Sequence, residues 1–160
     1  LTTYNIVIPM SQARSYVNIY ARRYPGVKQY WKTAPQLAKE TGYAETLGKR
    51  RYKIEEWATN TWGCESSAIN FPVQGTGADQ KEIAIVTAAE KFGDDLHFAM
   101  DLHDGLWYYL PQENGKELAM DIKSCLNSIN YNEIWDMDVP IPLPFDAKLG
   151  NSFGTVEDLK

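Results

Sequence analysis

Residues 98–110 constrain the fold more than any other stretch, because they read as two β-strands joined by a tight polar turn. In the first half the apolar side chains alternate and fall on one face, namely Phe98, Met100 and Leu102. Residues 106–110 are aromatic and apolar, as in a strand buried on both faces. Between them stand His103, Asp104 and Gly105, a run rich in turn formers. The sequence predicts a rigid hairpin that holds a histidine and a carboxylate at its tip, a suitable place for binding a metal ion or a phosphate.

The composition is typical of a single folded domain. Of the 160 residues, 44% are hydrophobic, so we expect one unit over residues 1–160 with a loosely held tail at 152–160. Because the first residue is Leu1 rather than Met, we expect a cut piece or a processed product. Cys64 and Cys125 match no metal-binding spacing, which favours reduced thiols in a cytosolic protein. No apolar run approaches the roughly 18 residues of a membrane span and no signal peptide is visible, so we predict no membrane partner.

Charge is distributed unevenly along the chain. Residues 14–53 hold ten basic and two acidic side chains, although the whole protein has a net charge of −5. A basic first third beside an acidic remainder fits a contact with a phosphate backbone next to a cation site. An ordinary solvated surface is the other interpretation, and composition does not choose between the two.

Helical spacing of apolar residues predicts four helices, which begin near Ser11, Val27, Thr76 and Leu118. Ser11 is the expected N-cap of the first helix, Pro35 should kink or break the second, and Gly42 should end it. Pro72 should break any helix that arrives from Cys64. The helix over residues 76–92 is expected to bury one apolar set: Ala78, Ile85, Ala88, Ala89 and Phe92.

Two further stretches predict strands. Gly48 and Lys49 lie between short β-prone runs, and glycine in the first central position favours a type II′ hairpin turn. Residues 139–149 are proline-rich and alternating, as in an edge strand. The elements together predict one α+β unit.

Four stretches along the chain form a recognisable series. Residues 24–27 read YPGV after an amphipathic helix, residues 42–52 read GYAETLGKRRY, residues 68–79 read AINFPVQGTGAD, and residues 103–104 are His-Asp. In this order they resemble the palm region of family A DNA polymerases, the family of bacterial polymerase I and of phage polymerases. The second stretch is similar to the family's GYVETL…GRRR hairpin, the third to its AINxPxQGTAAD segment, and His103-Asp104 to motif C, usually written VHDE. The likeness covers residues 6–151. It implies a partial palm subdomain, a small antiparallel sheet that carries the motif C hairpin and is packed by several helices.

The resemblance implies template-directed nucleotidyl transfer, in which a primer 3′ end is extended with dNTPs with the help of two Mg²⁺ ions. It assigns Asp104 as a metal ligand and His103 as a catalytic residue near the primer terminus. Asn70 and Gln74 would contact the minor groove, where amide donors can test base-pair shape without reading sequence. Arg50 and Arg51 would hold DNA phosphates. The implied partners are primer-template DNA and dNTP, and the implied location is the cytoplasm of a bacterial or phage-infected cell.

The chain departs from the family pattern at several positions. The Glu that follows the motif C Asp is Gly105, and the Gln two residues before the His is Asp101, an extra carboxylate near the site. Ser66 replaces an Arg, and residues 150–153 only approximate GxNW. Motifs A and B do not occur in the sequence, so the other metal-binding Asp must come from elsewhere. We therefore expect a fragment, or one subunit of a split enzyme such as a phage polymerase, that is inactive until a partner supplies those motifs.

Three alternatives stay open. The chain could be a non-catalytic DNA-binding or structural remnant of a polymerase. It could be a metal phosphohydrolase that uses His97, His103 and Asp104, although the sequence has only these two histidines and such sites need more. Without the resemblance, His103-Asp104 would read as a polar turn, and Asn70 and Gln74 as turn and cap residues.

Overall fold

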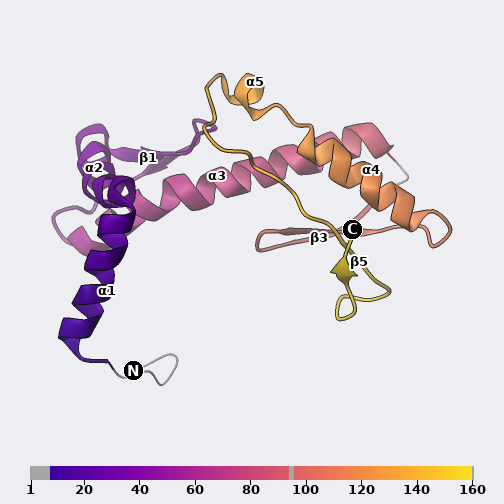
Figure 1. Cartoon of the computed structure of the whole chain (residues 1–160). Coiled ribbons are helices and arrows are strands. Elements are labelled where there is room, and N and C mark those ends of the chain that lie inside the picture. The colour runs from indigo at the N-terminus through magenta and orange to yellow at the C-terminus, as the bar shows by residue number, and fades with distance from the viewer. Residues whose placement is uncertain (1–7, 94–95, 160) are drawn as a thin grey trace. The chain divides into compact units, whose positions relative to one another are not determined.

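The computed structural model describes residues 8–93 and 96–159 and combines helices with short antiparallel strand pairs (Figure 1). The helices are α1 (Met10–Arg23), α2 (Pro25–Thr41), α3 (Thr61–Phe92), α4 (Gly115–Asn127) and α5 (Tyr131–Trp135). The strands are β1 (Tyr43–Glu45), β2 (Arg51–Lys53), β3 (His97–Leu102), β4 (Gly105–Tyr109), β5 (Lys148–Leu149) and β6 (Glu157–Asp158). Each strand pairs with its neighbour in sequence, β1 with β2, β3 with β4, and β5 with β6. The predicted α+β class is confirmed.

Backbone contacts divide the chain into two compact units. The first contains the residues up to Glu45 together with Arg51–Pro72, and the second contains Thr46–Arg50 and the residues from Val73 onward. Helix α3 contributes its beginning to the first unit and the rest to the second. A single domain over residues 1–160 stays a prediction. None of the described helices is both long enough and apolar enough to cross a membrane.

The first unit is built on a small core. Ala38, Ala44, Ile54, Cys64 and Ala68 are buried there, with Trp57 and Phe71 packed against them. Helix α2 ends as predicted, because Gly42 adopts φ 83° and donates its N–H to the Ala38 carbonyl. One local prediction is wrong: Ser11 lies inside α1, whose cap is Pro9. Of the kink or break predicted at Pro35, the break does not occur, because α2 continues through that residue. A proline costs a helix one hydrogen bond, and α2 tolerates that loss.

In the second unit α4 packs against the later part of α3 (Figure 1). Its core joins Ala84 and Ala88 of α3 to Ile122 and Leu126 of α4, and Leu106 of β4 packs against them. Ala88 is buried as predicted, but Ala89 is exposed. The predicted helix near Leu118 is confirmed as α4.

Two further predictions, one at Pro72 and one for residues 139–149, are wrong. Helix α3 runs from Thr61 with Pro72 inside it, so the proline does not separate two helices. Residues 139–147 form no strand; only β5 pairs, and its partner β6 lies in the tail that was expected to be loose. The prolines at 140, 142 and 144 lack the N–H groups that a strand ladder needs. Cys64 and Cys125 are buried and free, as the reduced-thiol interpretation predicts.

Candidate functional site

The predicted hairpin forms, and His103 and Asp104 are the two residues of its turn. Strands β3 and β4 pair antiparallel, and Leu102 lies opposite Gly105 at the end of the ladder. His103 carries the left-handed backbone conformation of the turn, with φ 54°. This conformation costs a non-glycine residue roughly 1–2 kcal/mol. The turn is therefore a place where some other contact must hold the backbone.

Two details of the hairpin differ from the prediction. A register shift between Phe98 and Met100 interrupts the alternation, and all of β3 is exposed. Strand β4 is half-buried rather than buried on both faces, and Tyr109 is 73% exposed. Within the described residues β3 and β4 form a two-stranded sheet, and neither of them pairs with a further strand.

Lys81 of α3 holds the hairpin close to its tip. Its Nζ donates to Asp101 Oδ1 at 2.5 Å and to the main-chain carbonyl of His103 at 2.7 Å. The Lys81 side chain is only 16% exposed, so the ammonium group is largely withdrawn from water. Asp101 is therefore an ion-pair partner of α3. Sequence analysis missed Lys81, because 20 residues separate it from Asp101 and no spacing rule connects them.

Asp104 itself is exposed, as is His103. Among the residues that the structure describes, no group of three or more His, Cys, Asp or Glu side chains could hold a metal ion. Of the residues that the structure describes, Asp104 is the carboxylate in the turn of this hairpin. Such an oxygen ligand suits Mg²⁺, which binds through one or two carboxylates together with water and substrate phosphates, but it fits only as part of a site completed by other groups.

An aromatic pair lies beside the turn. Trp107 stacks on Phe153 with 4.2 Å between ring centroids, and a Cβ atom on Gly105 would lie 3.3 Å from Trp107 Nε1. A larger residue at 105 would have to displace the indole slightly. The packing of Trp107 thus accounts locally for glycine at this position.

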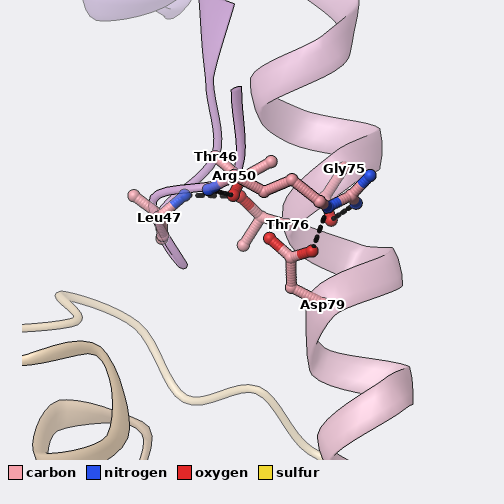
Figure 2. Close-up of polar contacts among 6 residues, drawn as sticks. All are labelled: Thr46, Leu47, Arg50, Gly75, Thr76 and Asp79. Atoms are coloured by element: carbon pink, nitrogen blue, oxygen red, sulfur yellow. Dashed lines mark hydrogen bonds and ion pairs between the residues drawn. The ribbon is translucent and has the colours of Figure 1, made fainter. Parts of the chain in front are cut away.

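The loop over residues 46–50 is anchored to α3 by side-chain hydrogen bonds (Figure 2). The Leu47 N–H donates to Thr76 Oγ1 at 3.0 Å, and Arg50 donates from Nε to Asp79 Oδ1 at 2.6 Å and from Nη2 to the Gly75 carbonyl at 3.0 Å. Asp79 is nearly buried, with 11% of its side chain exposed. Arg50, predicted to bind DNA, is therefore engaged within the second unit.

The turn type predicted for this loop is wrong. Lys49, not Gly48, has the positive φ, at 68°, and its N–H donates to the Thr46 carbonyl at 3.1 Å. The Thr46 N–H in turn donates to the Arg50 carbonyl at 2.9 Å, which closes a three-residue loop with a left-handed third residue. Gly48 is needed for space: a Cβ there would lie 3.0 Å from Asp79 Oδ2 and 3.2 Å from Trp135 Nε1.

The remaining predicted DNA-binding residues are exposed. Arg51 in β2 donates from Nε to Glu45 Oε2 at 2.8 Å, and its guanidinium lies 4.3 Å from the centre of the Tyr43 ring. Asn70 and Gln74 lie four residues apart on α3, and Asn70 Nδ2 donates to Ser66 Oγ at 3.2 Å. Trp62, one of the residues lining a shallow pocket with Asn70, is 80% exposed. The structure thus groups His103 and Asp104 with Lys81 and Asp101, and leaves the roles of Asn70, Gln74 and Arg51 as predictions.

The fold is that of part of a polymerase domain. The structure matches the POL domain of Pol1 from M. smegmatis, solved in complex with DNA primer-template and dNTP, with a TM-score of 0.68 and 23% identity over 75% of this chain and 22% of that chain. This likeness confirms the expected partial α+β polymerase subdomain.

Sequence comparison identifies the family. The profile of DNA polymerase family A matches residues 3–155. DNA polymerase I of Lactococcus lactis subsp. lactis is 27% identical in an alignment 158 residues long that covers 93% of this chain and 17% of the relative. DNA polymerase I of Pseudomonas aeruginosa is 28% identical in an alignment 155 residues long that covers 92% of this chain and 16% of the relative. The chain belongs to DNA polymerase family A and spans about a sixth of the length of these relatives.

Proposed function

We propose that β3, β4 and the turn between them form the motif C part of a DNA-directed DNA polymerase. In this proposal Asp104, in the turn, is a metal ligand. The observation that carries this proposal is the position of Asp104: an exposed carboxylate at a two-residue turn whose backbone is held by Lys81. The turn belongs to a chain of family A, in which the resemblance places the motif C carboxylate at this position.

The reaction proposed is extension of a primer. The primer 3′ hydroxyl gives up its proton to water and its oxygen forms a bond to the α-phosphorus of a dNTP. The bond from that phosphorus to the oxygen that bridges to the β-phosphate breaks, and pyrophosphate leaves. When bound, two Mg²⁺ ions would stabilise the attacking and leaving oxygens. Asp104 would hold its metal from a fixed backbone, and His103, next to it, would lie close to the primer terminus.

The site needs a second carboxylate. We propose that a segment carrying motifs A and B provides it, either elsewhere on the same polypeptide or as a separate subunit of a split or phage enzyme. Among the described residues no group of three or more His, Cys, Asp or Glu side chains could hold a metal ion, which supports this requirement. The isolated 160-residue segment should accordingly be inactive.

Primer-template DNA is the proposed partner of the exposed polar residues. Asn70 and Gln74 are exposed amides on α3 and would donate to minor-groove acceptors, which every Watson–Crick pair offers at similar places. Arg51 is exposed on β2 and would contact a phosphate. Arg50 would add to this attraction more weakly, because its donors already bind Asp79 and Gly75. The proposed location is the cytoplasm of a bacterial or phage-infected cell.

Primer extension tests the proposal. The segment is assayed with Mg²⁺ and four dNTPs, alone and together with the polypeptide that carries motifs A and B, and Asp104→Asn is the matched variant. We expect activity only in the mixture and its loss in Asp104→Asn. An assembled mixture that binds primer-template but never extends it would instead support a non-catalytic, DNA-binding remnant.

A further inference from the structure

We infer that Lys81 is a positioning residue that fixes the backbone of the motif C turn and thereby the direction of the Asp104 carboxylate. Its Nζ reaches both sides of the site: the Asp101 carboxylate on β3 and the His103 carbonyl in the turn. The inference rests on the proposed function for its catalytic consequence, but the turn itself can be tested without any polymerase activity.

The need for such a contact arises from the backbone of His103. This residue has φ 54°, a conformation that persists in non-glycine residues only when surrounding contacts enforce it. The hydrogen bond of 2.7 Å from Lys81 ends on the carbonyl of that same residue. A charged donor makes a stronger hydrogen bond than a neutral one, and the low exposure of Lys81 strengthens it further.

Asp101 has a separate and smaller role. It pairs with the Lys81 ammonium at 2.5 Å and so compensates a charge that is largely removed from water. The pair also explains how this chain accommodates an additional carboxylate three residues before Asp104. If Asp101 becomes neutral, Lys81 can still donate to the His103 carbonyl. If Lys81 is removed, the carbonyl loses this donor whatever residue occupies position 101.

The two variants therefore separate positioning from general stability. Lys81→Met keeps the aliphatic stem and removes the donor; Asp101→Asn keeps the shape and removes the charge. Lys116→Met, at an exposed position on α4, is the matched control.

Amide hydrogen exchange of residues 102–105, measured on the 160-residue chain, reports the order of the turn. We expect amide exchange about tenfold faster in Lys81→Met and in the variant that combines Lys81→Met with Asp101→Asn. A tenfold increase is the effect of losing ~1.4 kcal/mol of local stability. Asp101→Asn and Lys116→Met should stay within about twofold of the unsubstituted chain.

Primer extension in the assembled enzyme provides the second readout. Lys81→Met should lower kcat about tenfold or more and leave the KM for dNTP within about twofold, because a misplaced carboxylate affects the chemical step. Unchanged exchange at residues 102–105 in Lys81→Met overturns the inference, even if the enzyme is active. Equal acceleration in Asp101→Asn also overturns it, since the charge pair would then control the turn. If the unsubstituted assembly extends no primer, the proposed function fails while the exchange measurement still decides the role of Lys81.

Discussion

Arg50 donates from Nε to Asp79 Oδ1 across 2.6 Å, and this pair ties the 46–50 loop to α3 (Figure 2). The carboxylate is nearly buried whereas 46% of the Arg50 side chain is exposed. The same arginine also donates to the Gly75 carbonyl, at the start of the α3 segment that belongs to the second unit. An arginine of the family's hairpin motif thus acts here as a structural link.

Replacing Arg50 with Met should lower the free energy of unfolding by about 2 kcal/mol, because the nearly buried Asp79 carboxylate loses its partner. The loss should be smaller than for a fully buried ion pair, because the Arg50 side chain is about half exposed. Urea-induced unfolding measures the change. Arg51→Met is the control, since both partners of its pair with Glu45 are more exposed and such pairs contribute less than about 1 kcal/mol. Equal losses in the two variants would contradict the structural role of Arg50.

Arg51 should contribute more than Arg50 to DNA binding, whereas Arg50 should contribute more to folding stability. Arg51→Ala is expected to weaken binding to primer-template and to reduce the dependence of log Kd on log salt by about one unit, as loss of one phosphate contact does. Arg50→Ala should change that slope less, because its donors already bind protein. Fluorescence anisotropy with labelled primer-template at several salt concentrations gives both slopes. An Arg51→Ala slope equal to that of the unsubstituted chain would remove Arg51 from the interface.

Two glycines of the second unit should respond oppositely to alanine. Gly48→Ala would place a Cβ 3.0 Å from Asp79 Oδ2, an atom of a side chain held by Arg50, so we expect a loss of about 1–3 kcal/mol. Gly77 lies within α3, where a Cβ added to it would meet nothing within 4 Å, so Gly77→Ala should gain about 1 kcal/mol of helix stability. The denaturant midpoints of the two variants measure these opposite changes in stability. A midpoint of Gly48→Ala equal to that of the unsubstituted chain would contradict the steric role of Gly48.

Tyr30 should make the stability of the first unit depend on alkaline pH. Its hydroxyl donates to the Ile69 carbonyl at 2.7 Å, and burial raises the pKa of Tyr30 above its ordinary value of 10.0. The unfolded chain therefore ionises first as pH rises, so the contribution of Tyr30 is complete below pH 10 and is lost as pH rises through the folded-state pKa. Tyr30→Phe should lose about 1 kcal/mol at pH 7 and show a flatter decline above pH 10. An alkaline decline in the stability of the first unit that is unchanged in Tyr30→Phe would contradict this role. Tyr108 and Tyr131, whose pKa values burial also raises, belong to the second unit.

The sequence predicted the hairpin well because its signals are local. Alternating apolar residues and a polar break are enough to place β3, the turn and β4. The same holds for the end of α2 at Gly42. The resemblance of four motifs predicted membership of DNA polymerase family A, and the family profile that matches residues 3–155 confirms it.

Failures came where distant contacts override local preference. Pro72 should end a helix, yet α3 continues through it, with Ala68 before it and Ala84 after it buried in separate cores. Gly48 looked like the left-handed residue of its turn, whereas its small size is what Asp79 and Trp135 require. Lys81 gave no signal at all, because its partners Asp101 and His103 are 20 and 22 residues away.

The role of Asp104 as a metal ligand is the central claim, and exchange of the ligand atom tests it most directly. In the assembled enzyme, Asp104→Cys should lose activity about a thousandfold or more with Mg²⁺, which binds oxygen in preference to sulfur, and should recover part of it with Mn²⁺, which accepts softer ligands. Lys116→Met, exposed and outside the proposed site, is the control and should behave like the unsubstituted enzyme with both metals. Primer extension rates with each metal decide the matter. Full activity of Asp104→Cys with Mg²⁺ would contradict the claim that Asp104 binds the metal.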